Sequence, residues 1–190
     1  MRNLLILVIA ILWLSINPKQ VHAFVGGSIA PTQVPQDTLP VPKGIKNLLF
    51  YVQRDPNINT VVYELNVNAQ GVLNEKEPVK IYWIRYAEKG ERKDLSFIQR
   101  KFAYDLETKK LSPEKYELKF VSYSKLPLYL QKGTDGKYHV YTQFNQKQAM
   151  LNRAFVRIQG GTFWVPNVLY VDLIGREPGS LKVVTRRIIP

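Results

Sequence analysis

Apolar and polar residues alternate along several short stretches of the chain, a pattern typical of β-strands. The clearest stretch is Val79–Tyr86, which is rich in Tyr, Trp and Ile. Its residues Ile81 and Trp83 share one face. The other face carries Tyr82 and Ile84, so neither face is polar. A strand with large side chains on both faces is expected near the centre of a sheet, with cover on both sides.

The same pattern predicts about nine strands. They are expected at Leu48–Gln53, Thr60–Asn66, Val79–Tyr86, Lys115–Tyr123, Leu126–Gln131, Lys137–Phe144, Ala149–Gln159, Thr162–Val165 and Val168–Ile174, with Leu181–Ile189 as a last candidate. Turn signals separate them: a longish polar loop at Arg54–Asn59, Asp135-Gly136, Gly160-Gly161, and Pro166, which interrupts a strand run. This spacing predicts a mainly β fold, an antiparallel β-sandwich or partly open β-barrel, in preference to a closed ligand-holding barrel.

One short helix is predicted after the polar turn that follows Val79–Tyr86. Leu95, Ile98 and Phe102 recur at spacings of three and four, which gives an amphipathic helix. Asp94 is a suitable N-cap. The polar residues left to face water or a partner are Gln99, Arg100 and Lys101.

The N-terminal part of the chain carries the signals of export. Arg2 precedes an apolar run, Leu4–Leu14, and Val21-His22-Ala23 forms a small-residue cleavage site. Residues 1–23 are therefore expected to be a secretory signal peptide, with an uncleaved signal anchor as the alternative. Residues 24–46 are rich in Pro and Gly and predict a flexible leader, followed by a single all-β domain at 47–190. We expect a periplasmic or secreted protein without a transmembrane segment after cleavage.

The composition excludes several kinds of chemistry. The chain has no cysteine, which removes thiol nucleophiles, iron–sulfur clusters, thiolate zinc sites and a lipoprotein anchor. The net charge is +12, and loss of Arg2 and Lys19 with the signal leaves 12 − 2 = +10. Such a charge attracts anions, although scattered Lys and Arg also serve solubility alone. Nucleic acid is not an expected partner, because no binding motif is present.

Catalytic constellations are sparse. After the signal peptide, His139 is the single histidine, and neither a GxSxG motif nor a cofactor fingerprint occurs, so no cofactor or metal is expected. Carboxylates could still hydrolyse a glycoside if two of them met in a cleft. The candidates are Glu64, Asp94, Asp105, Glu117 and Asp172, and no sequence spacing brings any two together. A non-catalytic role is therefore favoured.

Arginines beside aromatic residues are the more informative feature. Arg85 shares a face with Trp83, Arg100 lies one helical turn before Tyr104, and Arg54 ends the first strand. Convergence of these five residues would form a pocket for an acidic or sugar-like group. The alternative is that Arg85 is a buried ion-pair partner of Glu64 or Asp94.

Two stretches resemble a known family. LFYVQRDPNINTVVYELN (Leu49–Asn66) and PVKIYWIRYAEKGERKDLSFIQRKFAY (Pro78–Tyr104) are similar to a family of small exported bacterial proteins known only as a domain of unknown function. The resemblance covers most of the chain from about Leu48. It implies export to a bacterial envelope and a single domain, and it supplies no activity or site residue.

Three functional hypotheses follow, in order of preference. The first is a non-catalytic binding or interaction domain of the bacterial envelope. The second is a carrier that holds an apolar or anionic small molecule, which the many inward-facing apolar residues would allow. The third is a carboxylate-based hydrolase. A cavity lined by apolar residues would distinguish the carrier from a domain with a filled core.

Overall fold

The computed structural model describes residues 38–162 and 165–190, and in these residues the chain is mainly β. The predicted signal peptide and most of the predicted leader lie outside the described residues. The described part of the predicted leader contacts the sheet: Leu39 is buried, and the Gln53 side-chain amide donates to the Pro40 carbonyl at 2.7 Å. No helix in the described ranges is long and apolar enough to cross a membrane.

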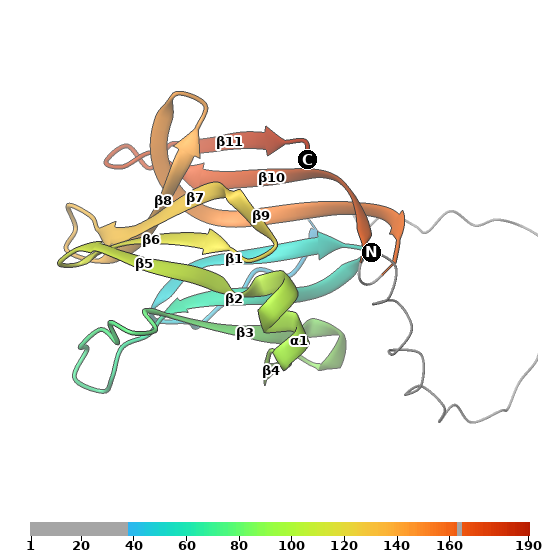
Figure 1. The fold of residues 1–190 in the computed structure, drawn as a ribbon, viewed down its shortest axis with the longest axis horizontal. Helices are drawn as coiled ribbons and strands as arrows, with labels where there is room; N and C mark the ends of the chain where they lie inside the picture. Colours follow the sequence, from blue (N-terminus) through green and yellow to red (C-terminus); the bar gives the residue numbers. More distant parts are fainter. Residues whose placement is uncertain (1–37, 163–164) are drawn as a thin grey trace, which may run out of the picture. The chain divides into compact units, whose positions relative to one another are not determined.

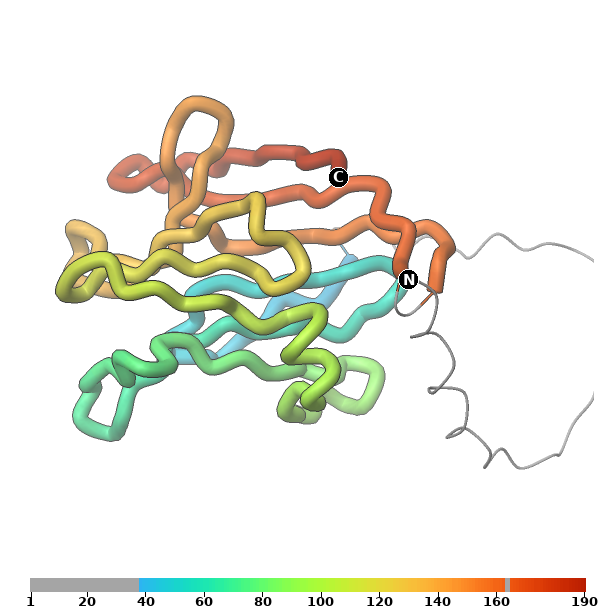
Figure 2. Tube along the Cα trace, viewed as in Figure 1, coloured from blue at the N-terminus to red at the C-terminus, as the bar shows by residue number. Residues whose placement is uncertain are grey.

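Eleven strands occur in the described residues, together with short helical segments (Figure 1). The strands are β1 (Leu48–Asp55), β2 (Asn57–Leu65), β3 (Val79–Arg85), β4 (Glu91–Asp94), β5 (Leu106–Ser112), β6 (Lys115–Phe120), β7 (Tyr123–Lys132), β8 (Tyr138–Phe144), β9 (Lys147–Gly161), β10 (Pro166–Arg176) and β11 (Val183–Ile188). The helical segments are η2 (Tyr86–Glu88), α1 (Phe97–Gln99) and η3 (Arg100–Tyr104). Most consecutive strands pair as antiparallel hairpins, and Figure 2 shows that some of the connections are tight turns and others are longer loops.

The sheet forks at β9, which is 15 residues long. Its first residues pair with β8, and its later residues pair in parallel with β1 on the same edge. β10 pairs along the opposite edge, and β11 follows β10. Strands β1 to β4 therefore form one lobe and β5 to β8 form a second lobe, in the order β4-β3-β2-β1-β9-β8-β7-β6-β5.

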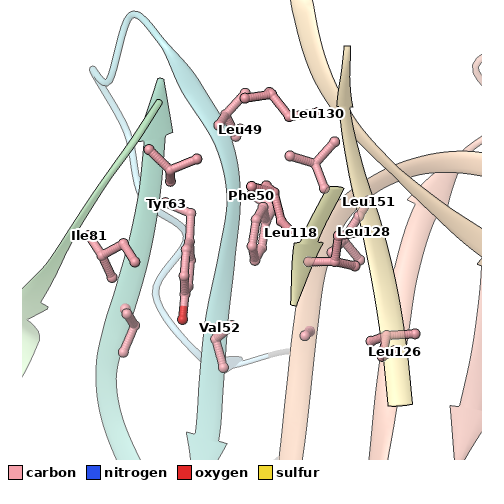
Figure 3. Packing of buried hydrophobic residues seen from close by; sticks show 14 of the residues in the cluster. Leu49, Phe50, Val52, Tyr63, Ile81, Leu118, Leu126, Leu128, Leu130 and Leu151 are labelled. Atoms are coloured by element: carbon pink, nitrogen blue, oxygen red, sulfur yellow. The ribbon is translucent and has the colours of Figure 1, made fainter. Parts of the chain in front are cut away.

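The two lobes curl toward each other and enclose the core. The ring of Phe50 in the first lobe stacks on Tyr63 at 4.3 Å, and Phe120 of the second lobe meets both rings edge-on at 6.1 and 5.7 Å. Figure 3 shows Leu49 and Leu130 at one end of this interior, and Val52 and Leu126 at the other. The sheet is a curled half-barrel, which confirms the predicted mainly β, partly open architecture. The β1–β9 pair is its one parallel pair among the described strands.

Two strands escape the sequence pattern because their side chains do not alternate in burial. All four residues of β4 are exposed, and β5 is exposed after its first residue.

Two connections between strands also differ from those that the sequence pattern predicts. β9 continues through Gly160 to Gly161, which faces Pro166 of β10, so the glycines belong to the strand. Only Pro56 separates β1 from β2, where the sequence predicts a longer loop.

The helix exists where the pattern predicts it, but it begins at a different residue and exposes a different face. Ser96 is the N-cap and forms a capping box with Gln99, whereas Asp94 belongs to β4. Gln99 points toward the sheet, where its side-chain oxygen accepts from the Trp83 indole N–H at 3.3 Å. The expected face is therefore wrong: Gln99 takes the inner position, and Phe102 is 57% exposed.

Candidate functional site

A cavity of about 520 Å³ lies between the two lobes, at the end of the interior that carries the helix. Both lobes contribute to its walls, as do the helical segments, the strands β9 to β11 and Pro190. Most of the lining side chains are apolar. They include Val52, Val61, Trp83, Phe120, Leu126, Val156, Ile158, Val171, Leu173 and Ile188.

Side chains of the paired strands β9 and β10 form one wall of the cavity. The inward face of β9 carries Ala154 and Val156, and β10 pairs Leu173 and Val171 with them. At the other end, Leu118, Leu128 and Leu151 are almost fully buried and fill the space between the lobes. The helical segments contribute Ile98, Phe102 and Tyr104 to the lining, and Gln99 is directed toward Trp83 of the sheet.

Exposed apolar side chains surround the cavity at its helical side. Phe97 is 75% exposed and Val165 is 74% exposed; Val165 lines the cavity together with Phe102. The ammonium group of Lys101 lies 5.7 Å from the Phe97 ring centre and 5.3 Å from that of Phe102. Clustered exposed aromatic residues of this kind are unusual on a protein surface and typically mark a contact surface.

A few polar groups interrupt the apolar lining. Arg54 is half-buried on the inward face of β1, and Asn59 lies nearby on β2. The Tyr104 ring packs edge-on against Trp83 with ring centres 5.2 Å apart. Burial raises the pKa of Tyr104, and the positive charge of Arg54 opposes that rise. The Tyr63 hydroxyl donates to the Tyr104 carbonyl at 2.8 Å, which ties the end of the helix to the sheet.

The structure brings together three of the five predicted site residues. Arg54, Trp83 and Tyr104 all line the cavity. Arg100 does not: its guanidinium lies 3.9 Å from a Glu77 carboxylate oxygen and donates to the Ile81 carbonyl at 3.5 Å.

The remaining predicted residue, Arg85, forms an ion pair with Glu88. The expected pairing of Arg85 with Glu64 or Asp94 is wrong. Arg85 ends β3 and the chain then turns into η2, which places Glu88 beside it. Glu64 instead accepts from the Tyr82 hydroxyl at 2.9 Å and lies 3.7 Å from Arg92.

No Asp or Glu side chain of the described residues lines the cavity. Asp172 is bound by both nitrogens of Arg187 at 2.7 and 2.8 Å, on the outer face of the sheet. His139 lies 2.9 Å from Asp135 in the β7–β8 hairpin, and the hydrogen bond from His139 lowers the pKa of Asp135. No group of three or more His, Cys, Asp or Glu side chains suited to a metal occurs in residues 38–162 and 165–190.

Sequence reasoning missed the wall formed by β9 and β10. Val156, Ile158 and Val171 alternate along their strands like any residues of a packed core. No signal in the sequence distinguishes an apolar residue that lines a cavity from one that meets a neighbour. The sequence pattern assigns Asn59 to a turn, and only its position at the start of β2 places it at the cavity.

The fold and the cavity define a mainly β domain with a hollow, apolar interior end. The chain belongs to a family described as a domain of unknown function (DUF4833), whose model matches residues 50–187. No curated protein and no solved structure matches the chain.

Proposed function

We propose that this domain binds an apolar small molecule in the cavity and does not convert it chemically. The observation that carries the proposal is the cavity itself, about 520 Å³ with a mostly apolar lining. Small-molecule sites in proteins span about 300–1,000 Å³ and combine apolar walls with a few polar groups. The lining has this composition, with Arg54, Asn59 and Tyr104 among many aliphatic and aromatic residues.

The energetics of packing support a role for this space. Protein interiors are normally packed as densely as organic crystals. The cavity opens to solvent, so its apolar walls contact water when no ligand is bound, and this contact costs free energy. A bound apolar ligand would recover this free energy. The exposed Phe102 and Val165 beside the cavity offer an entering apolar molecule an apolar surface to contact.

A binding role also fits the chemistry of the lining better than hydrolysis. The carboxylate mechanism needs two Asp or Glu side chains in one cleft. None lines the cavity among the described residues, and Asp172 and Glu64 are engaged elsewhere.

We further propose that the domain works outside the cytoplasm, in the bacterial envelope or as a secreted protein, because residues 1–23 have the signature of a signal peptide. An interaction domain without a ligand is the second candidate, favoured by the exposed Phe97 and Phe102.

Native mass spectrometry tests the binding role even when the identity of the ligand is unknown. The protein would be produced with its N-terminal segment, purified gently from a bacterial periplasm, and weighed in native and denaturing solvent. We expect a reproducible added mass that denaturation removes. A native mass equal to that of the bare chain, both before and after incubation with a lipid extract of the same cells, would contradict the binding role and leave the interaction domain.

A further inference from the structure

Arg54 is a cation at the edge of the apolar cavity that has no ion-pair partner among residues 38–162 and 165–190. Its side chain is half-buried, and its guanidinium makes no hydrogen bond or ion pair with any described residue. The neighbouring carboxylate, Asp55, lies on the opposite face of β1 and is paired with Arg157 of β9. A partly desolvated guanidinium is unfavourable unless an acceptor binds it. The Arg54 guanidinium therefore has donors from which no described residue accepts, and Asp55, the next residue along the chain, is paired elsewhere.

Two further donors accompany Arg54 in the lining. The Tyr104 hydroxyl makes no hydrogen bond within the described residues, although the ring is fixed against Trp83. Burial raises the pKa of Tyr104, and the nearby positive charge of Arg54 opposes this rise. On Asn59, the side-chain oxygen accepts from the Ala87 N–H at 3.1 Å, and the side-chain nitrogen has no acceptor in the described chain.

Several acceptors near this group are already used within the protein. The Tyr104 carbonyl accepts from the Tyr63 hydroxyl, and the Ala103 carbonyl accepts from the Ser122 hydroxyl at 2.7 Å. Arg54, Tyr104 and Asn59 thus bring a guanidinium, a phenolic O–H and an amide N–H₂ to the lining, all of them able to donate. Such a set is complementary to an oxyanion, because charged donors form the strongest hydrogen bonds with carboxylate or phosphate oxygens.

We propose that the ligand of this cavity is an acidic amphiphile. Its apolar body would occupy the space between the lobes, and its carboxylate or phosphate group would be held by Arg54 with help from Tyr104 and Asn59. This inference rests on the proposed binding function and adds the chemical class of the ligand. A carboxylate and a phosphate both present negatively charged oxygens to these donors. The experiment below distinguishes the two head groups.

The test compares three probes that carry the same chain: hexadecanoate, monohexadecyl phosphate and hexadecan-1-ol. Each acid is titrated into the protein below its critical micelle concentration and the alcohol below its solubility limit. Binding is followed by tryptophan fluorescence, to which Trp83 in the cavity lining contributes. We expect at least one acid to bind at least ten-fold more tightly than the alcohol, because only the acids offer a charged acceptor. The tighter of the two acids identifies the head group.

Substitutions then locate the acid. Arg54→Met keeps the aliphatic stem and removes the charge; we expect it to weaken binding of the preferred acid by about 10- to 100-fold and that of the alcohol by less than two-fold. Tyr104→Phe removes one hydroxyl and keeps the ring on Trp83, so a loss of about three- to ten-fold is expected. The matched control is Arg92→Met, which removes an exposed arginine from the outer face over Tyr82 and should change neither affinity.

The outcomes separate the two proposals. If the alcohol binds as tightly as both acids, the cavity binds apolar ligands and the acidic head group is wrong. If Arg54→Met weakens acid and alcohol equally, or weakens neither, Arg54 does not hold a head group. If none of the three probes binds, the binding function and this inference both fail. Thermal unfolding of each variant checks that the protein is folded. We expect Arg54→Met to fold, because no described residue pairs with Arg54.

Discussion

The two ends of the half-barrel interior carry similar apolar residues, but one end is densely packed and the other contains a cavity. At the closed end, Leu118, Leu128 and Leu151 interdigitate, and a Cβ added to Gly175 would lie 2.6 Å from the Phe144 ring. At the helical end, the same strands face a cavity of about 520 Å³. The difference teaches that apolar side chains stabilise the fold only where a partner meets them. Elsewhere they form a surface that a ligand can use.

The largest expected effect comes from shortening a side chain at each end. Leu128→Ala should lower the free energy of unfolding by about 2–5 kcal/mol, because Leu128 is fully buried and its loss leaves a hole. Val156→Ala, which enlarges a space that already exists, should cost less than about 1.5 kcal/mol. Urea denaturation measures both. Equal losses would show that the helical end is packed as tightly as the closed end.

The reverse change should separate binding from stability. Val156→Phe adds volume inside the cavity, so it should weaken binding of hexadecanoate by at least about ten-fold, while the free energy of unfolding changes by less than about 1.5 kcal/mol. Isothermal titration calorimetry and urea denaturation check the two quantities. The same substitution would be strongly destabilising if this end had no spare room.

Tyr63 belongs to both regions, since its ring stacks in the core and its hydroxyl binds the helix end. Tyr63→Phe should cost about 1 kcal/mol by leaving the Tyr104 carbonyl without its donor. Burial raises the pKa of Tyr63 well above 10. The unfolded chain therefore loses this proton first, and the free energy of unfolding falls as the pH rises above 10.

Urea denaturation of the wild type and Tyr63→Phe at pH 8, 9, 10 and 11 tests this coupling. The variant lacks the ionisable group, so its stability should fall less steeply above pH 10 than that of the wild type. The control is Tyr129→Phe, which removes a tyrosine hydroxyl from a partly exposed ring that takes no part in the contact with the helix end. A pH profile of Tyr63→Phe that runs parallel to that of the wild type would mean that the Tyr63 hydroxyl is not held in the folded state.

The smallest effect is expected at the exposed rim. Phe97 is 75% exposed and does not line the cavity, so Phe97→Ser should change the free energy of unfolding by less than about 0.5 kcal/mol. Thermal and urea unfolding provide the measurement. A loss above about 1 kcal/mol would indicate that the ring packs against the fold and that the rim is part of the core.

Much of the fold could be predicted from the local sequence pattern. Strands β1, β3 and β8 lie close to their predicted ranges because each is rich in aliphatic and aromatic residues of the types that favour strands. β4 and β5 remained hidden, since both lie at sheet edges with exposed side chains and leave no alternation to detect. The helix was found from its spacing, but its orientation was not, because the capping box with Ser96 and the Trp83 contact draw Gln99 inward.

The candidate site divides in the same way. The sequence singled out Arg54, Trp83 and Tyr104 from the conflict between charge and apolar surroundings, and the structure places all three at the cavity. The other two arginines, Arg85 and Arg100, come from the same kind of local pattern. Arg85 pairs with Glu88, only three residues further along the chain, whereas Arg100 lies near Glu77, which only the folded chain brings close to it.

By itself, the sequence determined that the chain forms a curled, mainly β domain without cysteine chemistry, because side-chain period and composition are local properties. The tertiary structure decided where the interior is filled and where it is hollow. That distinction depends on the parallel pairing of β1 with β9, which joins residues about a hundred positions apart and sets the small side chains of β9 and β10 opposite the helix. No local pattern records which apolar faces will meet, and so the cavity emerges only when the lobes close.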